Sequence, residues 1–197
     1  MAKSSFFWID GPVDFCYNND DEIYRPYLKM DPRSQKARGD LDTEEQHPPF
    51  PACFPSDFES DILPSAIQPI RIPVYRICTG GVLCKDAFLS SYEEVVRGLR
   101  PRPHWMDDAA LRQPGTYSTS CFYEKSDALH ILKCLRRHYP RPIIAYGEAR
   151  FEEGPVQRTI EREPNAGSHV DWWLYQDMDP SPRFEVCGRE EQTACQV

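Results

Sequence analysis

The sequence predicts an α+β fold, with one core in which a mixed or largely antiparallel sheet carries two helices. Three observations predict it. From residue 70 onward, segments with helical periodicity come early and strand-like segments then follow one another. A chain of 197 residues that is 40% hydrophobic can bury one core. No glycine-rich loop of the doubly wound or P-loop type is present. We therefore expect a core domain over residues 70–197, preceded by an irregular arm over residues 1–69.

The core region opens with an expected strand over residues 70–78, in which Pro73 is tolerable only at an edge or at the strand's start. A helix is expected over residues 86–99, with Asp86 as its N-cap and Gly98 at its end. The apolar stripe of this helix consists of Phe88, Leu89, Tyr92, Val95 and Val96.

A second strand is expected over residues 116–122 and a second helix over residues 127–138, with Ser126 as its cap and Pro140 beyond its end. Turns that contain proline, glycine or asparagine then separate a run of consecutive strands. These strands are expected at residues 142–151, 155–161, 169–175 and 182–187.

The arm is rich in proline and acidic residues from Asp14 to Pro69 and shows no sustained helical or strand period. Aromatic residues such as Phe50, Phe54 and Phe58 in this arm are unusual for a disordered segment. We expect the arm to pack over the core or to bind a partner.

The net charge of −8 argues against a nucleic-acid partner, because phosphate neutralisation supplies most of the affinity of such proteins. A basic strip does lie at and beyond the end of the second expected helix, where the helix dipole favours cations. It consists of Lys133, Arg136, Arg137, His138 and Arg141. We therefore attribute the strip to the helix end and expect no nucleic-acid partner.

No apolar run approaches the length of a transmembrane helix, so no membrane partner is expected. Asp10 interrupts the apolar residues 6–9 before a signal-peptide core forms. We expect a protein made in the cytoplasm, which includes a bacterial effector exported by a specialised secretion system.

Eight cysteines are scattered along the chain without a Cys-x-x-Cys pair. Structural zinc sites usually need such close pairs, so we expect no metal. Most of the thiols are expected to be reduced, and Cys187 and Cys195 are the pair that an oxidising compartment would join.

Three short motifs carry the chemistry. Tyr75-Arg76 lies in the first core strand, Ser118-Thr119-Ser120 lies in the second, and Glu161-Arg162-Glu163 ends a later strand. Arg76 and Ser118 are 42 positions apart, and Ser120 and Glu163 are 43 apart. In this order and spacing the motifs resemble the arginine–serine–glutamate class of mono-ADP-ribosyltransferases, over about residues 70–187.

The resemblance implies that NAD is the substrate, that ADP-ribose passes to a protein acceptor or to water, and that the protein is a bacterial effector, toxin domain or regulatory modifier. Glu163 would stabilise the positive charge that develops on the ribose, as a carboxylate does in glycoside hydrolysis, and Glu161 would orient the acceptor. Arg76, beside Tyr75, would hold a phosphate or ribose oxygen. Ser118 would bond the nicotinamide ribose, while Thr119 and Ser120 would fix the backbone of the cleft.

One departure from the family pattern affects the acid. Residues 164–167 separate Glu163 from the apolar strand that follows it directly in the family. Asp171, at the start of that strand, is therefore an alternative catalytic acid. Glu148, Glu152 and Glu153 are further candidates. His169 is expected to act as an acid, a base or a cofactor contact, or else to bond the turn that precedes it.

Two other functions remain open. A papain-like cysteine hydrolase would use Cys84, just before a helix, or Cys121, together with His169 and Asp171. A non-enzymatic interaction or inhibitor protein would use the acidic arm and one of the two tryptophans in the segment 171–175. Because Trp172 and Trp173 would face opposite sides of a strand, we expect one of them to be less buried unless both faces are covered.

Overall fold

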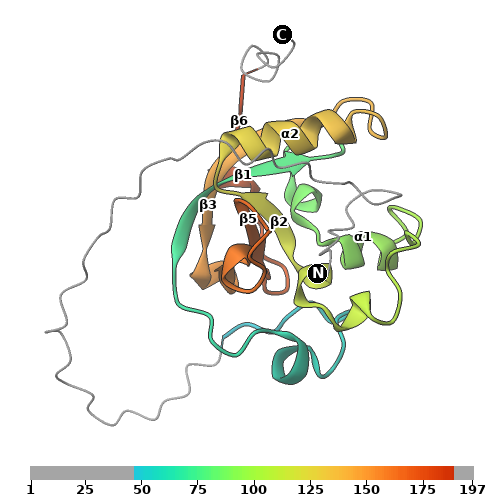
Figure 1. Cartoon of the computed structure of the whole chain (residues 1–197), viewed down its shortest axis with the longest axis vertical. Helices are drawn as coiled ribbons and strands as arrows, with labels where there is room; N and C mark the ends of the chain where they lie inside the picture. The colour runs from blue at the N-terminus through green and yellow to red at the C-terminus, as the bar shows by residue number, and fades with distance from the viewer. Residues whose placement is uncertain (1–46, 189–197) are drawn as a thin grey trace, which may run out of the picture.

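The computed structural model describes residues 47–188, which build one six-stranded sheet (Figure 1). The strand order is β4-β5-β2-β1-β3-β6, and each strand is antiparallel to its neighbours. The strands are β1 (Arg71–Cys78), β2 (Thr119–Phe122), β3 (Ile143–Arg150), β4 (Val156–Arg158), β5 (His169–Trp172) and β6 (Glu185–Val186). An antiparallel sheet with separate helices confirms the predicted α+β class. The arm before residue 47 and Cys195 lie outside the described residues.

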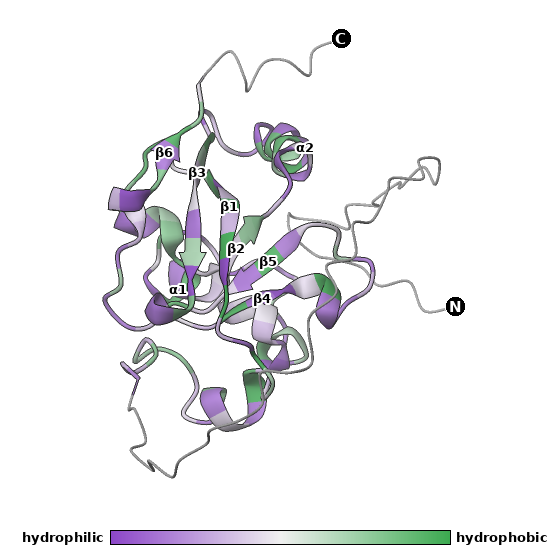
Figure 2. Ribbon diagram, turned by 90° about the vertical axis from the view of Figure 1, so that its left-hand side faces the viewer, coloured by the Kyte–Doolittle hydropathy of each residue, from purple (hydrophilic) through white to green (hydrophobic). Residues whose placement is uncertain are grey.

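Two α-helices accompany the sheet. α2 (Lys125–Leu135) packs against β1, β2 and β3 on one side, which we call the α2 face (Figure 2). α1 (Ser91–Val96) lies on the other side of the sheet in the same view and contacts the short helix η4 (Pro114–Tyr117). The other short helices are η1 (Phe58–Ile62), η2 (Lys85–Phe88), η3 (Ala110–Arg112), η5 (Phe151–Glu153), η6 (Thr159–Glu161) and η7 (Ser181–Arg183).

The two central strands, β1 and β2, pair over only two residues each. Tyr75 lies opposite Phe122 and Arg76 lies opposite Cys121. In contrast, β1 pairs with β3 along its whole length. Pro73 lies in the half of β1 that pairs with β3 alone, which is the edge-like position that a proline requires. The early separation of β1 from β2 opens the middle of the sheet.

The helix expected over residues 86–99 is split into η2 and α1, so Asp86 is not its N-cap as predicted. Ser90 caps α1 instead: its hydroxyl accepts from the backbone N–H of Glu93, and the Glu93 carboxylate accepts from the backbone N–H of Ser90. This capping box explains why the second helical segment starts late. Gly98, with a φ of +70°, follows the end of α1.

Three other boundaries differ from the prediction. α2 begins after Glu124, which makes no side-chain cap, so the predicted cap at Ser126 is wrong. β2 begins only at Thr119, because the residues before it form η4. β4 ends at Arg158, and the chain then turns into η6, which places Glu161 in a helical turn and not in a strand.

The alternation of side chains divides the sheet residues between two apolar clusters. The cluster on the α2 face joins α2 to the three strands beneath it and consists of Ile77, Phe122, Ala128, Ile131, Leu132, Leu135 and Ile144. The cluster on the opposite face includes Ile72, Val74, Cys78, Phe88, Cys121, Val156, Val170 and Trp172. Both faces of the sheet are therefore covered.

A third cluster joins the segment after residue 47 to the sheet. Phe54 and Phe58 are buried against Tyr117 and Trp173. Trp172 and Trp173 are both fully buried, and the Trp173 indole donates to the carbonyl of Pro114 at 2.8 Å. Because both faces are covered, the expected less-buried tryptophan does not occur, and neither ring is available as a surface anchor.

Candidate functional site

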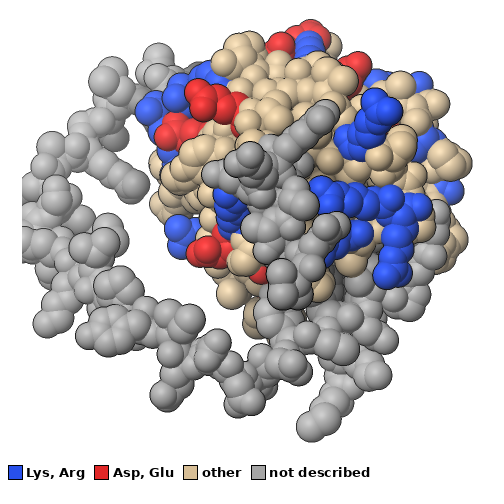
Figure 3. Space-filling model, turned by 90° about the horizontal axis from the view of Figure 1, so that it is seen from above, with Lys and Arg blue, Asp and Glu red and all other residues tan. Residues whose placement is uncertain are grey.

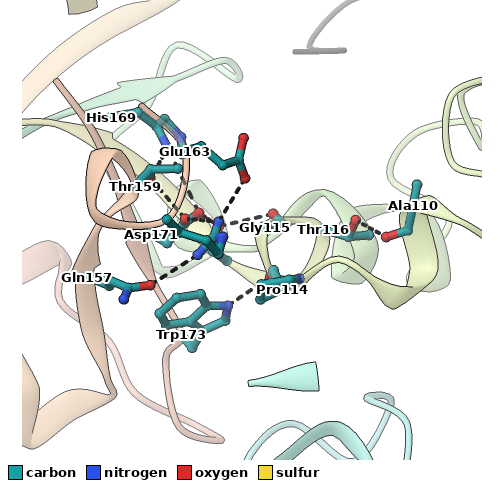
Figure 4. Close-up of polar contacts among 12 residues, drawn as sticks. Ala110, Pro114, Gly115, Thr116, Gln157, Thr159, Glu163, His169, Asp171 and Trp173 are labelled. Carbon is teal, nitrogen blue, oxygen red and sulfur yellow. Dashed lines mark hydrogen bonds and ion pairs between the residues drawn. The ribbon is translucent and has the colours of Figure 1, made fainter. Parts of the chain in front are cut away.

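Asp171 is the centre of a buried polar cluster on the α2 face of β5 (Figure 4). One carboxylate oxygen, Oδ1, accepts a hydrogen bond of 2.5 Å from the Ser118 hydroxyl. The other, Oδ2, accepts bonds from Thr159 at 2.9 Å and from Arg162 at 2.8 Å. Since β5 lies beside β2 in the sheet and Ser120 lies opposite Asp171, the carboxylate reaches the start of the Ser-Thr-Ser segment. The side chain is 0% exposed.

Arg162 connects the buried carboxylate to the surface. Its second terminal nitrogen donates to the Gln157 side chain at 3.1 Å, and the nitrogen that bonds Asp171 also lies 3.3 Å from a carboxylate oxygen of Glu163. Glu163 is one-third exposed, whereas Asp171 is fully enclosed. The two carboxylates therefore share one guanidinium, one on its buried side and one on its exposed side.

His169 belongs to the same cluster through Thr159. The ring nitrogen Nδ1 lies 2.6 Å from the Thr159 hydroxyl, and that hydroxyl donates its one proton to Asp171. Nδ1 must therefore carry a hydrogen, which leaves Nε2 as the acceptor of the neutral ring. A chain of two hydrogen bonds thus runs from His169 to the carboxylate.

The surroundings of Asp171 and His169 determine the protonation of both side chains. Burial opposes ionisation of Asp171, but the adjacent imidazole, the Arg162 guanidinium and the Ser118 hydroxyl outweigh it and hold the pKa of Asp171 below its usual value. Burial lowers the pKa of His169, against the opposing attraction of Asp171. The site therefore holds a carboxylate and a neutral imidazole near neutral pH.

Arg76, on β1, bridges the gap between the central strands. Its guanidinium donates to the backbone carbonyls of Ala87 at 2.7 Å, Ser120 at 2.6 Å and Leu89 at 3.2 Å. Three of its five N–H donors are thus engaged with the backbone, and two remain. Arg76 therefore holds η2, the segment after it and β2 in place.

The three hydroxyl residues divide between the two faces. Thr119 faces away from α2, and its hydroxyl donates to the carbonyl of Phe88. Ser118 and Ser120 point to the α2 face, where both line a hollow of about 60 Å³. The hollow lies where β1 and β2 separate, and its other lining residues include Arg76, Ser91, Glu94, Arg100, Ile131, Leu135 and Tyr139.

The structure does not bring every predicted residue to this hollow. Glu161 is exposed in η6 and, among the described residues, makes no side-chain hydrogen bond or ion pair with the Asp171 cluster. Tyr75 packs against Tyr146, with ring centroids 4.9 Å apart and the ring planes tilted by 40°. The three further candidate carboxylates pair with arginines elsewhere: Glu148 with Arg150, Glu152 with Arg71, and Glu153 with Arg183. Among the candidate carboxylates, all of which lie in the described part of the chain, Asp171 alone accepts a hydrogen bond from a side chain of the Ser-Thr-Ser segment.

A larger hollow of about 260 Å³ lies elsewhere, beside α1 and residues 174–178. Its lining includes Cys53, Lys85, Glu93, Arg97 and Tyr175 but none of the motif residues. Size alone therefore does not locate the motif-bearing site.

The chain has no significant match to a protein-family model, to a curated protein or to a solved structure. Arguments about its function therefore rest on the residues themselves. Among residues 47–188, no group of His, Cys, Asp and Glu could hold a metal ion, and no helix is long and apolar enough to cross a membrane.

Sequence reasoning did not identify three contributors to the site. Thr159 was expected at the middle of a strand, but the strand ends one residue earlier and the turn aims the hydroxyl at Asp171. Gln157 shares a face with Asp171 by register, a relation that the order of strands alone creates. Arg100 follows α1 in a proline-rich loop and pairs with Glu94 at 3.2 Å beside the hollow.

The thiol-hydrolase alternative finds little support in the geometry. Cys121 is fully buried, and burial raises its pKa to about 12, so it stays protonated. Its side chain lies in the cluster opposite α2, whereas His169 lies on the α2 face against Phe122. Cys84 is exposed and precedes only the four-residue η2. No described contact joins either thiol to His169.

Proposed function

We propose that this protein cleaves NAD between nicotinamide and ribose and transfers the ADP-ribose to a protein acceptor, with Asp171 as the carboxylate of the site. The observation that carries the proposal is the 2.5 Å bond between Ser118 and Asp171. It joins the residue that precedes β2 to an acid on β5, which neighbours β2 on one side, while β1 with Arg76 neighbours β2 on the other. Ser118 and Asp171, which are far apart in the sequence, are thus in contact, and Arg76 bonds the backbone of Ser120 next to them.

The chemistry needs a negative charge near the sugar. When the bond between the ribose carbon and the ring nitrogen breaks, the electron pair stays with nicotinamide, and the ribose becomes positively charged. The nucleophilic atom of the acceptor then attacks that carbon and releases its proton to solvent. A carboxylate stabilises the charged state and is worth most in a site that excludes water.

Ser118 would contact the ribose and Asp171 would act from behind it. A ribose oxygen bonded to Ser118 lies about 5 Å from the Asp171 charge, and at an effective dielectric of about 20 that separation is worth about 3 kcal/mol. An energy of about 3 kcal/mol corresponds to a rate factor of roughly a hundredfold. The effect is large enough for a kinetic test.

The hollow fits one end of NAD. Its volume of about 60 Å³ corresponds to roughly four to six water positions, which suits the ribose ring next to nicotinamide and not the whole dinucleotide. The diphosphate would therefore lie at the rim, where Arg100 supplies a guanidinium that is 22% exposed. Arginine suits phosphate because its planar donors bind two oxygens at once.

Arg162 opposes the full effect of Asp171 because it neutralises the carboxylate at 2.8 Å. In this proposal, Glu163 helps to position Arg162 and does not contact the ribose, which assigns it a different part from the one that the family resemblance implies.

The proposal is tested by nicotinamide release from NAD by the full chain, compared between Ser118→Ala and Thr116→Ala. Both hydroxyls are buried and bonded, but Thr116 donates to the carbonyl of Ala110, away from the cluster. Loss of release in Ser118→Ala with retention in Thr116→Ala supports the site. Equal release by both variants, or none by the wild-type chain with cell lysate as a source of acceptors, would refute it.

A further inference from the structure

The basic strip at the end of α2 is exposed along its whole length. Lys133, Arg136, Arg137 and Arg141, together with His138, are all exposed, and no carboxylate interrupts the sequence between residues 133 and 141. We call these five residues the basic surface. Figure 3 shows Lys and Arg side chains gathered on the face of the molecule seen from above, the side on which α2 lies in Figure 1.

The chain neutralises many of its other arginines. Arg71, Arg97 and Arg183 each pair with a carboxylate, as do Arg100, Arg150 and Arg162. Within residues 47–188, no ion pair or side-chain hydrogen bond is formed by the four Lys and Arg residues of the basic surface. A group of cations without counter-charges attracts an anionic partner.

The helix dipole explains only part of this arrangement. α2 ends at Leu135, so Lys133 is the one member of the surface in its last turn, and Arg136 is the C-cap. The influence of the dipole falls off within that turn. Arg141 lies five residues beyond the C-cap, where the dipole offers no reason for a cation.

The basic surface borders the candidate NAD site. Leu135 and Tyr139 line the hollow, and the three residues between them in the sequence, Arg136, Arg137 and His138, are exposed. A second contact fixes the far end: Gly81, with a φ of +75°, packs against the carbonyl of Arg141 so closely that a Cβ would lie 2.6 Å from it. The surface therefore borders the hollow at Leu135 and Tyr139, and its far end is packed against the turn at Gly81.

We propose that the basic surface docks an acidic segment of a partner protein. That this partner is the acceptor of ADP-ribose rests on the proposed function above, whereas the docking itself does not. A segment bound there would lie next to the hollow, which is where an acceptor side chain must be presented.

A protein segment fits these observations better than a nucleic acid does. The surface is short and confined to residues 133–141 of a chain whose net charge is −8. A nucleic acid extends its phosphates well beyond such a surface and would meet the acidic remainder of the chain. A short acidic peptide segment would pair with the basic surface alone.

The first experiment measures binding of fluorescein-labelled poly-L-glutamate to the full chain by anisotropy, at low and at physiological salt, with labelled single-stranded RNA as the comparison. The variant is Arg136→Glu/Arg137→Glu, and the control is Arg112→Glu, an exposed arginine of η3 outside the basic surface. We expect poly-L-glutamate to bind, salt to weaken the complex, and the double variant to lose about tenfold in affinity. Arg112→Glu should lose less than about fivefold in affinity.

Three results would overturn the docking surface: no binding of poly-L-glutamate, an equal loss in Arg112→Glu, or tighter binding of RNA through the same two arginines. Nicotinamide release in the absence of acceptor separates the two proposals. If the double variant releases nicotinamide like the wild-type chain but binds poly-L-glutamate weakly, both proposals are supported. If poly-L-glutamate binds as expected and the wild-type chain releases no nicotinamide, the docking surface is supported and the proposed function fails.

Discussion

Arg76 of β1 donates a hydrogen bond of 2.6 Å to the backbone carbonyl of Ser120 in β2, one residue beyond the last pair of the two strands. The guanidinium thus replaces the backbone ladder at the point where the central strands separate. It keeps Ser118 and Ser120 at the edge of the hollow while the strands leave space between them. The same side chain holds Ala87 and Leu89, so the position of η2 and of β2 depends on one residue.

Replacing Arg76 should lower the free energy of unfolding even when the positive charge is kept. In Arg76→Lys one ammonium cannot reach three carbonyls, and each carbonyl left unpaired costs about 1–3 kcal/mol. We expect a loss of about 2–5 kcal/mol in the free energy of unfolding, measured by urea denaturation. Arg102→Lys is the matched control, because Arg102 donates to the single carbonyl of Met106. Equal losses in both variants would contradict the bridging role of Arg76.

Arg100 should affect binding of NAD and not the chemical step. Loss of one charge-assisted bond to the diphosphate costs about 1.5–3 kcal/mol, which raises KM by roughly 10- to 100-fold. We therefore expect Arg100→Ala to raise KM for NAD and leave kcat within a few-fold, measured by nicotinamide release. Arg97→Ala, which removes an ion-paired arginine that lines the larger hollow, should leave KM unchanged. A fall in kcat alone would place Arg100 outside the diphosphate contact.

Acidification should destabilise the fold in two stages. The pKa of His169 is lowered by burial from 6.5, so the unfolded chain takes up this proton first, and stability falls as the pH drops below about 6.5. The pKa of Asp171 is lowered from 3.8, so its contribution is present above that value and is lost as the pH falls further. Melting temperatures of His169→Gln should show a smaller decline between pH 7 and 5 than those of His104→Gln, an exposed control. Identical declines would show that His169 titrates normally.

Thiol reactivity should follow exposure and not catalysis. Burial raises the pKa of Cys121 to about 12 and that of Cys78 to about 11, so neither should react with iodoacetamide in the native protein near neutral pH. Cys84 is exposed and should react at the rate of an ordinary thiol. Mass spectrometry of the alkylated peptides measures the three rates. Rapid alkylation of Cys121, or a Cys84 that reacts far faster than glutathione, would restore the hydrolase alternative.

The fold class followed from local patterns because each strand and helix carries its own periodicity and turn residues. The observed boundaries differ from the predicted ones where two local sequence signals competed. Asp86 and Ser90 are both good caps, and Glu93, three residues after Ser90, decides between them through its backbone and side-chain bonds. β4 ends at Arg158, earlier than expected, and the turn that follows is held by the bond from the Thr159 hydroxyl to Asp171. Such choices depend on tertiary contacts that a short window of sequence does not contain.

The site was only half predictable for the same reason. Arg76 and the Ser-Thr-Ser segment lie on strands that follow one another among the central strands, so their proximity was a natural expectation. Asp171 lies 53 positions after Ser118, and their contact exists because β5 inserts beside β2 and not beside β4 alone. Glu163 had the stronger motif, yet it follows η6 and reaches the cluster through Arg162. The order of motifs in the sequence suggests both carboxylates, and the order of strands in the sheet places Asp171, but not Glu163, against Ser118.

The most direct test compares the initial rate of nicotinamide release from NAD by the wild-type chain, Asp171→Asn and Glu163→Gln. Melting temperatures confirm that each variant is folded, and Ser118→Ala supplies a second readout should Asp171→Asn prove too unstable. The account predicts a fall of about a hundredfold in Asp171→Asn, whereas Glu163→Gln should stay within a few-fold of wild type. Loss of release in Glu163→Gln with retention in Asp171→Asn would contradict the assignment of the carboxylate, and no release from any folded form would contradict NAD cleavage itself.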